Sequence, residues 1–272
     1  MTKNPTKPSK QKSKRKERLT SPQGRCVLSG FDSFGKHKSN PSEVIVEASP
    51  DILKTSPVTP TSSAKEIHIS KVVLPTEGDK AWAKLKKELD RLSGSLESKN
   101  GKSAKKVKEP TILVLTGYSQ RAERLQLERI ALNLKDYRIP DNSGKQVFDE
   151  PVVKKAPLAL RSQIDLRALA KGLNADGYPA EVSNHAGTFI CNELYFEALN
   201  YIAATEALSK KFVACLFVHI PDEKTFVESA ASLKKSPLKK EVKAAQKHKG
   251  LRSEFLRDGV LKIVEHIAHA VV

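Results

Sequence analysis

Runs of apolar and β-branched residues alternate along the chain with segments of helical periodicity. The runs at 26–29, 67–75, 111–117 and 212–219 predict strands, and a further strand is expected at 180–183. The run at 111–117 is apolar throughout, which is typical of a parallel strand covered by helices on both faces. These runs therefore indicate a sheet whose centre is buried.

Apolar residues recur at three- and four-residue intervals between these strands, the spacing of an amphipathic helix. Helices are expected at 79–92, 161–174, 189–208 and 253–271, and another after Asn40-Pro41, with Ser42 as its N-cap. Alternating strands and helices predict an α/β fold, a three-layer α/β/α sandwich with a mostly parallel mixed sheet.

The hydrophobic pattern also divides the chain. Residues 1–24 are rich in Lys, Ser and Pro and are expected to be a disordered basic tail. Residues 25–272 are expected to form one domain, with polar insertions near 55–64 and 94–109.

The net charge of +17 belongs to these polar segments. Residues 1–25 carry +8, residues 94–109 carry +3 and residues 234–252 carry +7, which leaves the remaining chain at −1. The first 25 residues also contain no aromatic side chain on which bases could stack. Weak contact with polyanions is open to the tail, but a solvated tail is the favoured interpretation and nucleic acid is not an expected partner.

No stretch approaches the roughly 18 consecutive apolar residues of a membrane helix, and lysines stand where a signal peptide would be apolar. Three scattered cysteines make no disulfide framework, and no Cys or His pair has zinc-ligand spacing. We therefore expect a protein of the reducing cytoplasm, without a zinc site.

Cys191 is the cysteine best placed for chemistry, because Cys26 and Cys215 lie inside apolar runs where a thiol is a packing group. Cys191 lies where a loop becomes a helix, and the positive helix end favours a nucleophilic thiolate. A buried cysteine that anchors the helix explains the same spacing equally well.

A thiol nucleophile needs a base, and His219 ends an apolar strand at the edge where α/β folds build their sites. His185 is the rival, although a histidine that stabilises the loop would also stand there. Spacing alone does not choose the orienting carboxylate among 31 acids.

Four separated blocks together resemble the cysteine-dependent pyroglutamyl peptidases of type I. They are Gly30-Phe31-Asp32-Ser33-Phe34-Gly35 with Asn40-Pro41-Ser42, the segment 127–133 around Glu128 continued by Arg138-Ile139-Pro140-Asp141-Asn142, the block 183–192 around Cys191, and Phe217-Val218-His219-Ile220-Pro221. Their order is also that of the family.

The resemblance implies a cysteine exopeptidase that removes N-terminal pyroglutamate through a thioester, without a cofactor. It implies Cys191 as the nucleophile, His219 as the base and then the acid, and Glu128 as the carboxylate that orients His219. It further implies Phe31 and Phe34 as walls of the lactam pocket, Arg138 as an electrostatic contributor near the oxyanion, and possible homo-oligomers.

One segment departs from the family pattern. Gly117-Tyr118-Ser119-Gln120 stands where a glycine-rich loop is usual, so Tyr118 is expected to reshape the pocket. Two alternatives stay open at this point: a related cysteine amidase with another substrate, and a non-catalytic protein that binds polyanions through its basic tail.

Overall fold

Eight strands form one sheet in the computed structural model, which describes residues 23–35, 39–57, 63–93 and 109–272. The strand order within these ranges is β2-β3-β1-β4-β8-β5-β6, and β7 pairs with β5. The bounds are β1 (Gly24–Phe31), β2 (Ile52–Lys54), β3 (Glu66–Leu74), β4 (Thr111–Tyr118), β5 (Leu125–Leu132), β6 (Ala159–Arg161), β7 (Ala180–His185) and β8 (Phe212–Ile220).

The sheet is mixed. Strands β3, β1, β4 and β8 are mutually parallel, whereas β5 runs antiparallel to β8 and carries β7 parallel to itself. The short strands β2 and β6 pair antiparallel with β3 and β5. Strand β4, which is buried over residues 111–117, lies between β1 and β8 in the interior of the sheet, as its sequence predicts.

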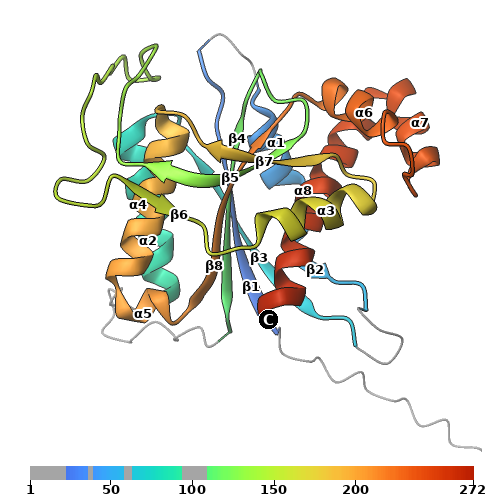
Figure 1. Ribbon diagram of the computed structural model, residues 1–272, viewed down its shortest axis with the longest axis horizontal. Coiled ribbons are helices and arrows are strands. Elements are labelled where there is room, and N and C mark those ends of the chain that lie inside the picture. The colour runs from blue at the N-terminus through green and yellow to red at the C-terminus, as the bar shows by residue number, and fades with distance from the viewer. Residues whose placement is uncertain (1–22, 36–38, 58–62, 94–108) are drawn as a thin grey trace, which may run out of the picture.

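Helices cover both faces of the sheet, which confirms the predicted three-layer sandwich (Figure 1). One layer holds α2 (Gly78–Ser93), α4 (Ile190–Ala204) and α5 (Glu206–Ser209). The other holds α1 (Pro41–Ala48), α3 (Leu166–Ala175), α6 (Glu223–Ala231), α7 (Lys239–Lys247) and α8 (Lys249–Val271).

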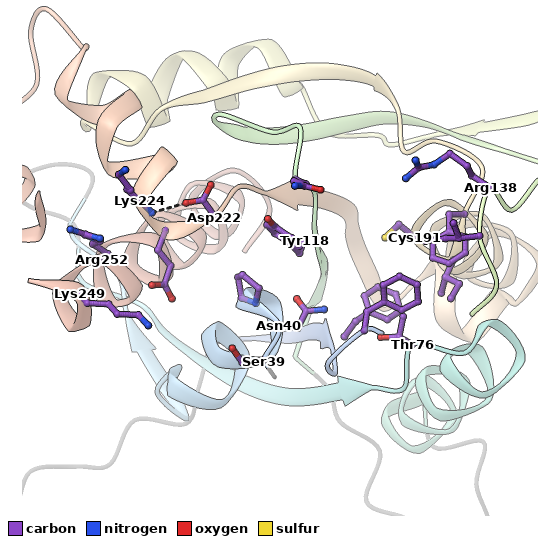
Figure 2. Close-up of a pocket in the computed structure, with 18 residues that line it drawn as sticks. Ser39, Asn40, Thr76, Tyr118, Arg138, Cys191, Asp222, Lys224, Lys249 and Arg252 are labelled. Atoms are coloured by element: carbon purple, nitrogen blue, oxygen red, sulfur yellow. Dashed lines mark hydrogen bonds between the residues drawn. The ribbon is translucent and has the colours of Figure 1, made fainter. Parts of the chain in front are cut away.

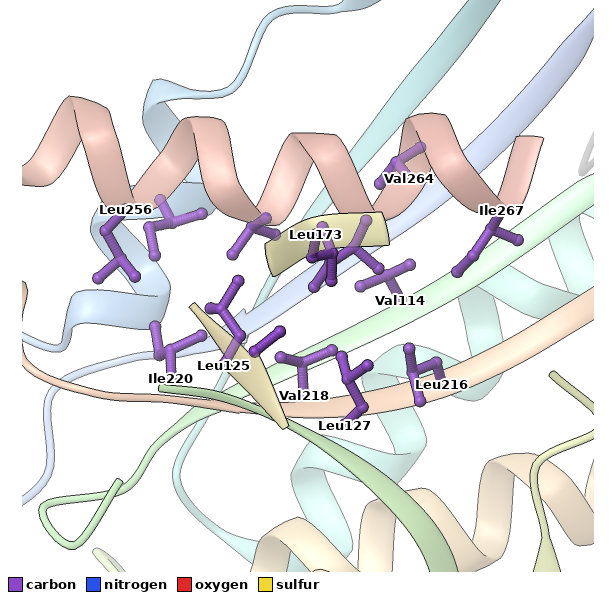
Figure 3. Close-up of a cluster of buried hydrophobic side chains, with 14 of the residues drawn as sticks. Val114, Leu125, Leu127, Leu173, Leu216, Val218, Ile220, Leu256, Val264 and Ile267 are labelled. Carbon is purple, nitrogen blue, oxygen red and sulfur yellow. The ribbon is translucent and has the colours of Figure 1, made fainter. Parts of the chain in front are cut away.

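Alternation along the strands decides which side chains meet each helical layer. On β8, Leu216, Val218 and Ile220 face the long helix α8 and pack with its Leu256 and Val264 (Figure 3). The intervening positions of β8 therefore point to the opposite face, where α4 lies. This parity directs the polar residue at position 219 toward α4.

Several predicted boundaries were wrong for local reasons. The helix expected at 161–174 begins only at Leu166, because Asp165 caps it and Arg161 ends β6. The helix expected at 189–208 is interrupted at Thr205 between α4 and α5. The cap of α1 is Asn40, whose Oδ1 accepts the Ser42 N–H, and not Ser42.

Other elements were not predicted at all. Strand β5 mixes charged and apolar residues, and β2 and β6 have three residues each. Helix α7 lies inside the lysine-rich stretch 234–252, with Val242 and Ala245 as its buried residues, and α8 begins at 249, not 253. Most of the tail and most of the two predicted insertions lie outside the described residues.

Candidate active site

Strand pairing brings His219 and Glu128 together from positions far apart in the chain. His219 of β8 is paired with Gln126 of the antiparallel β5, and Glu128 lies two residues farther along β5, on the same face. The ring nitrogen Nδ1 of His219 is 2.7 Å from Oε1 of Glu128. The Glu128 side chain is only 1% exposed, so this contact is shielded from water.

Cys191 reaches the same place from the first turn of α4. Its sulfur fits beside β4 because position 117, which is paired with His219, is a glycine. A Cβ atom added to Gly117 would lie 2.9 Å from the Cys191 sulfur and 2.9 Å from the Phe217 ring, closer than real Cβ contacts allow. The lack of a side chain at Gly117 therefore leaves the space that the Cys191 sulfur occupies.

The electrostatics of His219 favour a charged ring. Burial disfavours the imidazolium, but hydrogen bonds from the ring to Cys191 and Glu128 outweigh it and raise the pKa of His219 to about 10. Because Nδ1 is held by Glu128, the other ring nitrogen is left for the sulfur. The ring and the sulfur are thus in position to exchange a proton.

The other two thiols are structural. Cys26 is fully buried and Cys215 is 7% exposed, and burial raises the pKa of both. Cys191 is the partly exposed cysteine of the chain. The packing function that the sequence predicts for Cys26 and Cys215 agrees with this burial.

Helix α4 is fixed to the strand that carries the carboxylate. The amide of Asn192, next to the sulfur-bearing residue, accepts the Leu132 N–H at 2.7 Å and donates to the carbonyls of Leu132 and Leu134 at 2.9 Å each. The Tyr195 hydroxyl donates to the Glu128 carbonyl at 3.2 Å. These bonds set the position of Cys191 relative to Glu128.

A cavity of about 670 Å³ opens beside Cys191 (Figure 2). The predicted wall residues Phe31 and Phe34 both line it, and so do Arg138 and Tyr118. Phe189 completes an aromatic group, since its ring packs edge-on against Phe34 at 5.8 Å and Tyr137 at 4.7 Å between centroids. The cavity thus has an apolar end near the sulfur.

Polar residues of two of the quoted blocks hold the loop that carries these walls. Asn40 donates to the Asp32 carbonyl at 2.9 Å, and Ser42 Oγ accepts the Phe31 N–H at 2.9 Å. From the other side, Asn142 donates to the Ser33 carbonyl at 2.8 Å. The Asn-Pro-Ser and Asp-Asn segments therefore position the pocket wall.

Three other histidines of the described part of the chain lie away from this arrangement. The exposed His185 accepts the Gly187 N–H at 3.2 Å, which is the loop-stabilising alternative weighed for it. His266 pairs with Asp176 and His269 contacts the Ser56 carbonyl, both through the last helix. His219 is thus the histidine in contact with Cys191.

Sequence patterns missed part of the cavity lining. Gln120 and Thr76 lie on loops, and a charged group forms the far end of the cavity: Asp222, Glu223, Lys224, Lys249 and Arg252. The sequence pointed to Gln120 through the altered segment 117–120, and to Lys249 and Arg252 through the polar content of 234–252, which did not indicate a cavity. No helix among the described residues could span a membrane, and none of their His, Cys, Asp and Glu side chains gather in threes at metal-ligand spacing.

A sulfur, an imidazole and a buried carboxylate in contact, at the mouth of a cavity in an α/β/α sandwich, are typical of cysteine hydrolases. The pyroglutamyl peptidase family model matches residues 25–247. The chain belongs to the pyroglutamyl peptidase family, and is a cysteine peptidase of that type.

Individual relatives agree with the family assignment. The pyrrolidone-carboxylate peptidase of Treponema denticola is 32% identical over 197 residues, covering 72% of this chain and 78% of that protein. The solved pyrrolidone carboxyl peptidase of Pyrococcus furiosus superposes with a TM-score of 0.65 at 25% identity, over 91% of this chain and 100% of the other. That of Fervidobacterium islandicum gives 0.63 at 25% identity, over 90% and 99%.

Proposed function

We propose that this protein hydrolyses the amide bond that follows an N-terminal pyroglutamate, releasing 5-oxoproline and a shortened peptide. The observation that carries the proposal is the contact of His219 with both Cys191 and Glu128 beside a cavity walled by Phe31 and Phe34. A pyroglutamyl group has a neutral lactam where other peptides carry an ammonium group. Apolar aromatic walls suit such a ring.

The proposed reaction begins with attack of the Cys191 thiolate on the pyroglutamyl carbonyl carbon. N–H groups of the first turn of α4 have no partner within the helix and can hydrogen-bond to the developing oxyanion, with Arg138 as a nearby positive charge. The His219 imidazolium then gives its proton to the departing amine as the C–N bond breaks, which leaves a thioester.

Water completes the cycle. His219, now neutral, takes a proton from water, whose oxygen attacks the thioester carbonyl. The C–S bond breaks and the sulfur leaves as a thiolate, so the enzyme returns to its starting ion pair. Glu128 keeps the ring oriented and stabilises its charged form in both halves of the reaction.

The test is release of fluorescent aminomethylcoumarin from its pyroglutamyl amide under reducing conditions. We expect wild-type protein and a Cys215→Ala control to release it, and a Cys191→Ser variant to lose activity by at least about 10³-fold. Iodoacetamide at mildly acidic pH is expected to label Cys191 in preference to the two buried cysteines. Equal activity of the wild-type and Cys191→Ser proteins would refute the proposal.

A reducing compartment such as the cytoplasm belongs to the same proposal, because the reaction needs a free thiol and the three cysteines are unpaired. Family membership is the reason to prefer pyroglutamyl peptides to other N-acyl amides. Homo-oligomer formation, and weak polyanion contacts of residues 1–24, stay predictions.

A further inference from the structure

The cavity extends well beyond the space that one lactam ring needs. Its volume, about 670 Å³, falls in the range of pockets that enclose drug-sized ligands. Figure 2 shows Lys224, Lys249 and Arg252 gathered at the end opposite Cys191, with Tyr118 between the two ends. When the pyroglutamyl group of a peptide lies at Cys191, the residues that follow it extend toward this second end.

The second end is built by the helices of the C-terminal region. Lys224 lies in the first turn of α6, and Lys249 and Arg252 lie in the first turn of α8. Two of these cations, Lys249 and Arg252, belong to the stretch 234–252, whose charge of +7 has no part in the proposed chemistry at Cys191. Folding brings the end of that stretch to the cavity.

Asp222 and Glu223 keep their negative charges, so the three cations leave this end with a net charge of +1, but both carboxylates are hydrogen-bonded within the protein. Asp222 caps α6, where its Oδ1 accepts the N–H groups of Lys224 and Thr225 at 3.0 Å each. Glu223 accepts a hydrogen bond from the Ser253 hydroxyl. Neither carboxylate lies within ion-pair distance of Lys249 or Arg252.

The three cations at this end, Lys224, Lys249 and Arg252, retain positive charge that can act on a ligand. Lys224 has a long contact of 3.7 Å with Glu228, and both of these side chains are largely exposed. The Arg252 guanidinium donates to the carbonyls of Ala245 and Gln246, which do not cancel its charge. Within the part of the chain that the structure describes, neither Lys249 nor Arg252 forms an ion pair.

We propose that Lys249 and Arg252, with Lys224 beside them, form a subsite for a carboxylate in the portion of the substrate that departs as the amine. The enzyme then prefers pyroglutamyl peptides with an acidic side chain, or a free C-terminal carboxylate, shortly after the pyroglutamyl residue. This inference rests on the proposed function and adds the class of peptide. Selectivity for charge comes from the residues that follow the cleaved bond, because the pyroglutamyl group itself is uncharged.

The experiment compares kcat/KM for matched peptides. One arm uses the C-terminal amides pyroglutamyl-Ala-X-Ala with X as Glu, Gln or Lys, and the other uses pyroglutamyl-Ala-Ala as the free acid or the amide. We expect the Glu peptide to exceed the Gln peptide by roughly fivefold at low salt, with Lys lowest, and the advantage to shrink as salt rises. The second arm shows whether a terminal carboxylate serves as well as a side chain.

Variants test whether Lys249 and Lys224 cause the preference for an acidic peptide. Lys249→Gln combined with Lys224→Gln is expected to bring the Glu-to-Gln ratio close to one. Lys243→Gln combined with Lys239→Gln is the matched control, since these exposed lysines of α7 do not line the cavity, and it is expected to keep the ratio. Arg252 is left intact because it also holds the end of α7.

Two results would overturn the inference. Equal kcat/KM for the Glu, Gln and Lys peptides, together with equal kcat/KM for the free acid and the amide of pyroglutamyl-Ala-Ala, is one, and a preference that survives unchanged in the Lys249→Gln, Lys224→Gln protein is the other. In both cases the coumarin substrate would still be hydrolysed, so the proposed function would stand. If no pyroglutamyl substrate were cleaved, both the proposed function and this inference would be refuted.

Discussion

Two histidine–carboxylate pairs among the described residues have similar nitrogen–oxygen distances in different surroundings. His219 and Glu128 approach to 2.7 Å, and His266 and Asp176 to 2.9 Å. The side chains of the first pair are 12% and 1% exposed, and those of the second are 30% and 41% exposed. Hydrogen-bond length alone therefore does not distinguish the pair that we propose to be catalytic from the other.

The two pairs also differ in the groups that surround the part of the histidine ring not bonded to the carboxylate. His219 contacts a thiol and stands near a cavity, whereas His266 packs over Gly172 of α3 and joins α8 to that helix. A Cβ at Gly172 would lie 2.6 Å from the His266 ring, as a Cβ at Gly117 would meet the Cys191 sulfur. Burial, contact with a thiol and a neighbouring cavity therefore distinguish the pair that we propose to be catalytic from the other pair.

Replacing each imidazole in turn gives the largest expected difference. His219→Asn removes the proton carrier, and we expect kcat on the pyroglutamyl coumarin substrate to fall by at least about 10³-fold. His266→Asn is the matched control and is expected to retain activity within about twofold, with a small loss of stability at most. Comparable losses in the two variants would remove the distinction between the pairs.

Neutralising each carboxylate is expected to have the next largest effect. Glu128→Gln keeps the shape but removes the charge that stabilises the imidazolium, so kcat should fall on the order of 10²-fold. Asp176→Asn, at the partly exposed pair, should leave kcat unchanged. Both are read from steady-state kinetics, with circular dichroism to confirm that the variants fold.

The two glycines provide a finer test. Gly117→Ala places a methyl group against the Cys191 sulfur and the Phe217 ring, and we expect a roughly tenfold loss of kcat from the displaced nucleophile. Gly172→Ala pushes the His266 ring instead, so its cost should appear as a lower midpoint of urea unfolding and not in kcat. The prediction fails if Gly117→Ala has normal kcat.

The smallest effect is a pH dependence of stability. Because the folded pKa of His219 is raised to about 10, its contribution is complete below the unfolded value of about 6.5 and is lost as pH rises toward 10. The free energy of unfolding should therefore fall between pH 7 and pH 10 more steeply in the wild type than in a His219→Gln variant. Urea titrations at several pH values measure this, with His266→Gln as the control, and parallel curves would contradict it.

The sequence predicted the fold well where burial leaves a simple pattern. The apolar runs of β1, β4 and β8 and the periodic α2 indicated the sandwich without any structural information. Strand β5 was not predicted because Arg129, directly after Glu128, breaks the apolar–polar alternation that begins at Leu125, and α7 was not predicted because only two of its residues are buried. Tertiary contacts, and not local propensity, account for both elements.

The candidate site was predicted unevenly. Position at a strand end and at a helix start pointed to His219 and Cys191, but only the resemblance selected Glu128 among the acids. Spacing could not select it, because the pair forms across two antiparallel strands 91 residues apart in the chain. The basic end of the cavity combines side chains of α6 and α8, whose meeting no local pattern encodes.

The Asn192 amide has a further consequence, for the way the enzyme adapts to different peptides. By joining α4 to the end of β5, it ties Cys191 and Glu128 together through hydrogen-bonded elements. Adjustment to a bulkier or longer ligand then falls to the walls carried by loops, such as those bearing Phe34 and Arg138. To change the substrate range, substitutions should therefore be made in those loops, while α4 and the hydrogen bonds of the Asn192 amide are left unchanged.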